Sequence, residues 1–180
     1  MKKTVGAVGI LVILFSLNSL YAEDSIEADE AFVMKNSTVN ESFVRSMARN
    51  RAHVGDEGAV FVEVDGVDEF KEKMESGELD STIREGNGIT KQYIYKNIKN
   101  VNIDDRDLRD MEGDMLNLGT TIESDNQQVV QVLNITDSEI NVDEHQINAG
   151  IMSETSNLEG AINRTTIKNS VLKGMTMEED

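Results

Sequence analysis

The sequence has 180 residues, with no cysteine and no proline, and its formal net charge is −17 at pH 7. The lack of cysteine excludes disulfides and thiol chemistry, and with only His53 and His145 available the usual zinc sites cannot be built within one chain. The excess of acid disfavours nucleic acids and anionic membrane surfaces as partners, because both require clustered Lys and Arg.

Residues 1–22 have the layout of a bacterial secretory signal peptide. Two lysines precede the apolar run 5–15, and the polar stretch that follows ends in Ala22, where we expect cleavage. The apolar run is about half the ~20 residues that a membrane-spanning helix requires. We therefore expect residues 23–180 to be exported to the periplasm, the cell surface or the medium, with no stable membrane insertion after cleavage.

Residues 23–38 are acidic and weakly patterned, which predicts a flexible segment ahead of the folded part. The spacing of residues 38–41 is that of a capping box, and apolar residues then recur at helical intervals. This pattern predicts a first helix over 39–53.

A short strand and a second helix are predicted next. Val60, Val62 and Val64 alternate with Phe61 and Glu63, which indicates a strand, and Asp65-Gly66 ends this strand with a turn. Apolar residues at helical spacing then predict a helix that Gly77 ends. Residues 39–85 are thus expected to form a small α/β segment.

The first predicted helix carries the densest basic cluster of the exported part, Arg45, Arg49 and Arg51. One interpretation is a solvated helix face. The other is a contact surface for an acidic partner, either the repeat region of another copy or another envelope protein.

Aromatic residues end at Tyr95, and residues 86–174 carry an imperfect repeat instead. An apolar-Asn-apolar triplet returns along the chain, and its last copy is degraded. The asparagines are Asn102, Asn117, Asn134, Asn148 and Asn163, so the steps in residue number are 15, 17, 14 and 15. A nearly fixed period of this kind indicates one structural unit that buries its apolar face by stacking on its neighbours.

We expect each unit to be a β rung. The triplets lie among β-branched residues and among Asn, Asp, Ser and Gly, which favour strands and turns over helix interiors. In a strand the two apolar residues of a triplet share one face and Asn points to the other. Stacked at ~4.8 Å, the five asparagines would form a hydrogen-bonded ladder.

Two other interpretations of residues 86–174 stay open. Leu133, Ile140 and Ile147 recur at heptad spacing, as in a coiled coil, but the register does not extend over the ~3–4 heptads that a coiled coil requires. An acidic, Asn-rich composition is also typical of a disordered segment. Residues 175–180 are read as an acidic tail.

In its design the repeat region resembles the subunits of bacterial functional amyloids, the curli and Fap-type surface fibres. These are exported and soluble, and carry imperfect repeats of Asn and apolar residues. The resemblance extends over about residues 86–173; the glutamines of this region do not recur in register as they do in curli subunits. It implies assembly through stacked β repeats.

No catalytic site is recognised. No Gly-x-Ser-x-Gly motif surrounds any serine, and His145, between two polar residues, is interpreted as a solvated turn residue. The densest acidic group has no EF-hand spacing, so we expect no cofactor and at most weak Ca²⁺ binding. That group is Asp104, Asp105, Asp107, Asp110 and Asp114.

The sequence therefore predicts a mainly β fold, a short β-solenoid or stackable β-array of ~15-residue repeats, preceded by a small α/β segment. The predicted function is that of an exported, non-enzymatic structural protein, a subunit or accessory of a surface fibre or extracellular matrix. It would associate with itself or with another envelope or fibre protein through strand edges. The alternative is a monomeric periplasmic binding or accessory module, and an enzyme ranks third.

Overall fold

The computed structural model describes residues 40–55, 58–84, 88–111, 113–155 and 157–175. The predicted leader and the acidic segment 23–38 lie outside these residues, as do all but the first of residues 175–180. Two helices and twelve strands are present in the described part: α1 Glu41–Val54, β1 Ala59–Asp65, α2 Val67–Glu75, β2 Thr82–Ile83, β3 Lys91–Lys99, β4 Asn102–Asp104, β5 Met115–Asn117, β6 Thr120–Ile122, β7 Gln128–Thr136, β8 Glu139–Asn141, β9 Gln146–Asn148, β10 Ile151–Ser153, β11 Gly160–Lys168 and β12 Val171–Lys173.

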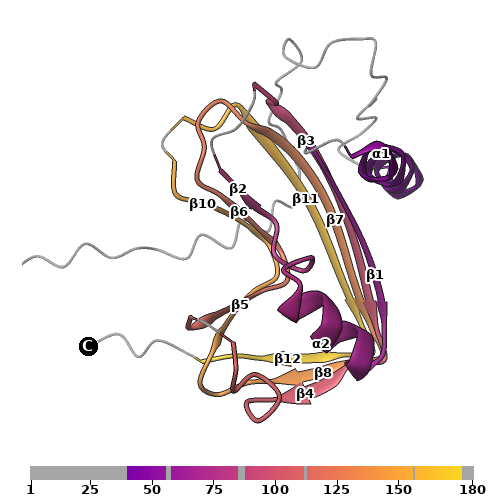
Figure 1. Cartoon of the computed structure of the whole chain (residues 1–180), viewed down its shortest axis with the longest axis vertical. Helices are drawn as coiled ribbons and strands as arrows, with labels where there is room; N and C mark the ends of the chain where they lie inside the picture. Colours follow the sequence, from indigo (N-terminus) through magenta and orange to yellow (C-terminus); the bar gives the residue numbers. More distant parts are fainter. Residues whose placement is uncertain (1–39, 56–57, 85–87, 112, 156, 176–180) are drawn as a thin grey trace, which may run out of the picture.

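The strands form a parallel β-solenoid, as the sequence predicted (Figure 1). Its main sheet has the order β1-β3-β7-β11, and the last three of these strands are nine residues long. Three smaller columns complete the cross-section: β2-β6-β10, β4-β8-β12 and β5-β9. All pairs are parallel, because each strand lies beside the strand at the same place in the next turn.

The length of one turn is about twice the repeat that the triplets indicated. In the main sheet Ala59 pairs with Tyr93, Lys91 with Gln128, and Gln128 with Gly160, so the offsets in residue number are 34, 37 and 32. Successive triplets therefore fall on different columns of the solenoid, two of them in each full turn. The β-solenoid is confirmed, whereas the ~15-residue rung is wrong.

Helix α1 lies against the outer face of the main sheet (Figure 1). Asn40 is its N-cap and accepts a hydrogen bond from the N–H of Phe43, and Gly55 ends it in the left-handed conformation. The helix buries Val44 and Ala48 against Tyr93, Tyr95 and their neighbours. The helix packs mainly on β1 and β3, the strands that carry Phe61, Tyr93 and Tyr95.

Helix α2 takes the place of a short strand in the first turn. It follows β1 after Gly66, buries Phe70 in the core, and Lys71 pairs with Asp107 of the second turn at 2.6 Å. Because β1 and β2 hydrogen-bond to β3 and β6, residues 59–83 form the first turn of the solenoid. The expected boundary near residue 85 therefore separates two turns of one body.

The interior of the solenoid is mainly apolar, with buried polar side chains among it. Leucine, isoleucine and valine side chains of successive turns stack in its lower part, as the row Val64, Ile98 and Ile135 illustrates. Higher in the cross-section the buried residues include Lys96 and Gln131, which hydrogen-bond to backbone carbonyls of the opposite wall. Within the described residues, no helix has the length and apolarity needed to cross a membrane.

Candidate functional site: the open end of the solenoid

Within the described residues, the solenoid ends after half of its fourth turn. Strands β11 and β12 stack on β7 and β8, but no described strand stacks on β9 or extends the column beyond β10. The effect on burial is large: Ile98 and Ile135 are fully buried, while Ile167 at the same position in β11 is 49% exposed. We call the surface formed by β9 to β12 the open end.

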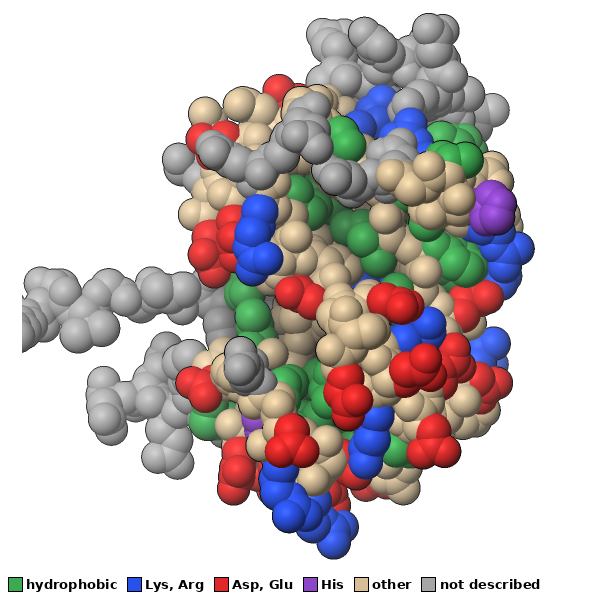
Figure 2. Space-filling model, viewed as in Figure 1, with side chains coloured by type: hydrophobic (Ala, Val, Ile, Leu, Met, Phe, Trp, Pro, Cys, Tyr) green, Lys and Arg blue, Asp and Glu red, His purple; other side chains and the backbone are tan. Residues whose placement is uncertain are grey.

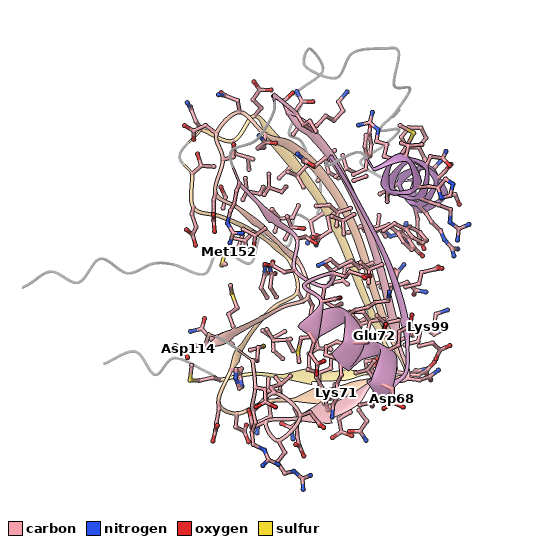
Figure 3. All side chains as sticks on the ribbon, viewed as in Figure 1. Asp68, Lys71, Glu72, Lys99, Asp114 and Met152 are labelled. Atoms are coloured by element: carbon pink, nitrogen blue, oxygen red, sulfur yellow. The ribbon has the colours of Figure 1, made fainter. Side chains whose placement is uncertain are left out.

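A hollow of about 470 Å³ lies where the second half of that turn would be. Its walls come from Ile147, Ile151 and Met152 of the third turn and from Ile167 and Leu172 of the fourth. Met152, labelled in Figure 3, comes from β10. Val171 and Met175 beside it are 55% and 39% exposed. The open end thus combines apolar side chains with a concave surface.

The open end also exposes a strand edge. Every second residue of β11 directs its N–H and C=O away from β7, and no strand pairs with this edge within the described residues. Residues 160–173 carry three basic residues, Arg164, Lys168 and Lys173, and no acidic one. All three are exposed. In a chain with a net charge of −17, this edge carries more basic than acidic residues, although Arg164 pairs with Glu41 at 3.9 Å and Lys173 with Asp143 at 2.6 Å.

The opposite end is acidic. Residues 59–75, which form β1 and α2, contain six acidic and two basic residues, and Asp65, Asp68, Glu72 and Glu75 are exposed. Figure 2, seen from the side on which α2 lies in front, shows Asp and Glu side chains gathered over the lower half of this face. Asp68 and Glu72 are labelled on α2 in Figure 3. We call this surface the α2 end.

The five asparagines of the predicted ladder are spread over several columns and form no single ladder. Asn117 and Asn148 are direct neighbours, and the Asn148 amide donates to Asn117 Oδ1 at 2.9 Å. Asn102 is exposed on β4 and lies beside Glu139. Only Asn117 and Asn148 therefore stack as expected, because successive triplets in the sequence lie on different sides of the cross-section.

The other two asparagines of that set lie on opposite faces of the main sheet. Asn134 is on the outer face and donates to Glu41 Oε1 of α1 at 3.0 Å. Asn163 points inward from β11 and accepts a hydrogen bond from Gln131 at 2.9 Å. Asn134 therefore holds helix α1 against the main sheet, whereas Asn163 hydrogen-bonds to Gln131 inside the solenoid.

The three arginines of α1 lie over the rings of the main sheet. The guanidinium carbons of Arg45, Arg49 and Arg51 are 5.3, 4.8 and 4.9 Å from the centroids of Tyr95, Phe61 and Tyr93, respectively. Arg45 and Arg49 also pair with Glu63. These contacts attach α1 to the sheet. The arginines therefore have roles within the chain that the sequence did not indicate.

In the acidic group that begins at the end of β4, Asp104, Asp105 and Asp107 are engaged by residues of their own chain, whereas Asp110 and Asp114 are exposed. Asp104 binds Arg106 and Asp107 binds Lys71, at 2.5 and 2.6 Å at the shortest. Asp105 accepts the backbone N–H groups of Asp143 and Glu144 at 2.9 and 3.0 Å. No group of three or more His, Asp or Glu within the described residues is arranged to hold a metal ion.

His145, expected in a solvated turn, is instead largely covered. Its side chain is 12% exposed, and Nδ1 lies 3.3 Å from Asp105 Oδ1. Asp105 thereby connects the loop after β4 to the loop after β8 in the next turn.

This connection gives a prediction about acid stability. Hydrogen bonds from the N–H groups of Asp143 and Glu144 lower the pKa of Asp105. A carboxyl whose pKa is lower in the folded state contributes stability above its unfolded pKa and loses it as the pH falls through the folded value. We expect Asp105→Ala to lower the thermal midpoint at pH 7 and to reduce its fall between pH 5 and pH 3. Asp110→Ala, at an exposed position nearby, is the control; equal melting curves for both variants would contradict the assignment.

A second concave surface lies between α2 and β5. It has a volume of about 660 Å³ and is lined by Met74, Met111 and Met115 together with Asp80 and Asp107. Methionine side chains adapt to differently shaped partners. This groove is the feature of the described residues that best suits a binding module.

The corners after the long strands carry a sequence signal for the true turn length. Segments 97–100, 134–137 and 166–169 each contain Asn or Thr, then Ile, then Lys or Thr, then Asn or Asp. The last residue of each adopts a positive φ of 51 to 54° at the corner after a long strand. Asn and Asp tolerate this conformation better than most residues. Aligning the corners Asn100, Asp137 and Asn169 would have given steps in residue number of 37 and 32, those of the turns themselves.

Comparison of the chain with protein-family models, with curated proteins and with solved structures finds no match.

Proposed function

We propose that this chain is an exported, non-enzymatic structural protein, a subunit or accessory of a bacterial surface fibre or extracellular matrix, which assembles through the open end of its solenoid. The observation that supports this proposal is the half-finished fourth turn, which leaves a nine-residue parallel strand without a partner on one edge, beside exposed apolar residues, within the described part of the chain. Natural solenoids cover such ends, because an unpaired edge recruits other strands.

Assembly through this end follows from its chemistry. The edge of β11 offers backbone donors and acceptors to an incoming strand, and the apolar residues beside it supply the area that such addition buries. Removing apolar surface from water contributes about 25 cal/mol per Å². A partner that completes the fourth turn would therefore gain backbone hydrogen bonds and bury apolar surface in the same contact.

The proposal is tested by placing a charge in the edge. We expect Ile167→Lys to abolish filaments or higher oligomers of the purified protein in negative-stain images and in sedimentation velocity. Val54→Lys is the matched control, because Val54 is 77% exposed at the end of α1, outside the open end. Both variants should melt as the wild type does, since exposed substitutions change stability by about 0.5 kcal/mol or less. A wild-type protein that stays monodisperse, or unchanged assembly of Ile167→Lys, would overturn the proposal.

The second candidate function is a monomeric periplasmic binding or accessory module. The Met-lined groove between α2 and β5 favours it, because grooves of this size accept peptides or small apolar ligands. On this alternative, Met111→Glu should weaken retention of an envelope partner while Ile167→Lys leaves retention unchanged.

A further inference from the structure

Backbone hydrogen bonds at one corner of the solenoid point toward a further turn. The corner residue of each turn donates its N–H to the carbonyl before the same corner in the following turn. The three bonds run from Gly66 to Lys99 (2.9 Å), from Asn100 to Thr136 (3.2 Å) and from Asp137 to Lys168 (3.1 Å). The next donor in the series is the N–H of Asn169, and the described residues contain no fifth turn to accept it.

The first turn of the chain has the geometry of a strand that could continue the main sheet beyond β11. Strand β1 is parallel to the other long strands and pairs with one neighbour only, so its outer edge has no strand partner within the described residues. Continuing the existing register, a β1 placed beyond β11 sets Asp65 opposite Lys168, because Asp65, Lys99, Thr136 and Lys168 form one row. The carbonyl of that Asp65 would then accept the N–H of Asn169.

The charges of the two ends favour contact between the open end of one copy and the α2 end of another over contact between two open ends. Two open ends facing each other would bring basic residues of both copies onto one interface, of which Arg164 and Lys173 are paired with Glu41 and Asp143 of their own chain. Opposite charges across an interface favour the correct encounter, and like charges oppose it. The α2 end, with six acidic residues against two basic ones, offers the complementary sign, and the exposed Asp68 and Glu72 of α2 belong to it.

We infer that the occupant of the open end is the α2 end of a second copy of this chain, whose β1 continues the main sheet in parallel beyond β11. This inference rests on the proposed function and names its partner. Contacts of this head-to-tail kind repeat without closing, so they produce filaments rather than dimers.

The test exchanges charges across the inferred contact. Asp65→Lys and Lys168→Glu should each weaken self-association about tenfold, because each turns an attractive pair into a repulsive one. A 1:1 mixture of the two variants should recover assembly, since Lys at position 65 of one variant then faces Glu at position 168 of the other, and the remaining contact is the wild-type pair. The double variant Asp65→Lys/Lys168→Glu should recover it as well.

Sedimentation velocity at about 0.15 M salt reports the association, and at about 1 M salt the differences should shrink because surface charges are screened. Arg109→Glu changes the net charge by the same magnitude at an exposed position in the loop after β4 and should leave assembly unchanged. If Ile167→Lys abolishes assembly but the mixture of charge variants does not recover it, the open end is used and the head-to-tail partner is wrong. If the wild type does not assemble, both proposals fail.

Discussion

Gly119→Ala is expected to destabilise the solenoid by about 3 kcal/mol, which lowers the thermal midpoint by roughly 10 °C. A Cβ at this position would overlap the carbonyl oxygen of Gly150 in the next turn and lie 2.8 Å from its nitrogen. The obstacle is backbone on both sides, so no side chain can move to make room. The two turns would have to separate.

Separation would cost several hydrogen bonds. The Gly150 carbonyl accepts the N–H of Thr120 at 2.9 Å, and the N–H of Gly119 donates to the Asn148 carbonyl at 2.8 Å. The Gly119 carbonyl also accepts from Lys96 Nζ at 2.7 Å. These groups are buried or partly buried, and each that loses its partner costs about 1–3 kcal/mol.

Gly150→Ala is the matched control for this prediction. Its added Cβ would meet only side-chain atoms, at 3.8 and 3.9 Å, which is ordinary contact, so the midpoint should change little. Thermal unfolding followed by far-UV circular dichroism compares the two variants. Equal midpoints would mean that the turns do not approach as closely at Gly119 as the structure indicates.

The local elements were predictable because their signals are local. The first helix was expected over 39–53 and is observed at Glu41–Val54, and Gly77 follows the second helix as predicted. Alternation over 60–64 marked β1, observed at Ala59–Asp65. The β-branched composition of the later triplets was enough to favour strands, and stacked strands of similar composition imply a solenoid.

The register was not predictable from the triplets, because strands on different sides of one turn have the same composition. Leu116-Asn117-Leu118 and Leu133-Asn134-Ile135 look alike, yet the first lies in a short column and the second in the main sheet. The turn length is set by the corners, where the positive φ of Asn100, Asp137 and Asn169 fixes the direction of the chain. These corner residues are a weak signal among the many asparagines and aspartates of the sequence.

The candidate site was harder to predict from the sequence than the fold. Ile167 has the same local pattern as Ile98 and Ile135, and it is exposed because no following turn covers it within the described residues. The partners of the α1 arginines lie on two strands of successive turns, so the rings could not be placed under the helix before the register was known. In each case burial depends on long-range stacking.

Lys96 was not identified from the sequence, because a lysine within a strand is ordinarily expected to face water. It is fully buried, and its Nζ donates to the carbonyls of Leu79 and Gly119 at 2.5 and 2.7 Å. A strand covered on both faces hides the alternation on which such a reading depends. Lys96 connects the main sheet to the opposite wall, as Gln131 does one turn later.

We expect Lys96→Ala to lower the free energy of unfolding by at least about 3 kcal/mol. The substitution removes the buried alkyl stem and leaves two carbonyls without their donor, and these losses add. Lys99→Ala, at the exposed end of the same strand, should change stability by about 0.5 kcal/mol or less. Urea unfolding compares both with the wild type; similar midpoints for the two variants would show that Lys96 does not bridge the walls.

The buried amine also predicts a pH dependence with a defined sign. Burial lowers the pKa of Lys96 from 10.5 to about 7. Between these values the unfolded chain binds a proton that the folded chain does not, so stability rises with pH, by at most about 1.4 kcal/mol per unit. Burial raises the pKa of Tyr95 above 10, which keeps that phenol protonated below pH 9. In Lys96→Met the rise between pH 7 and pH 9 should therefore disappear, whereas Lys99→Met should retain it; a rise that persists in Lys96→Met would assign the proton to another group.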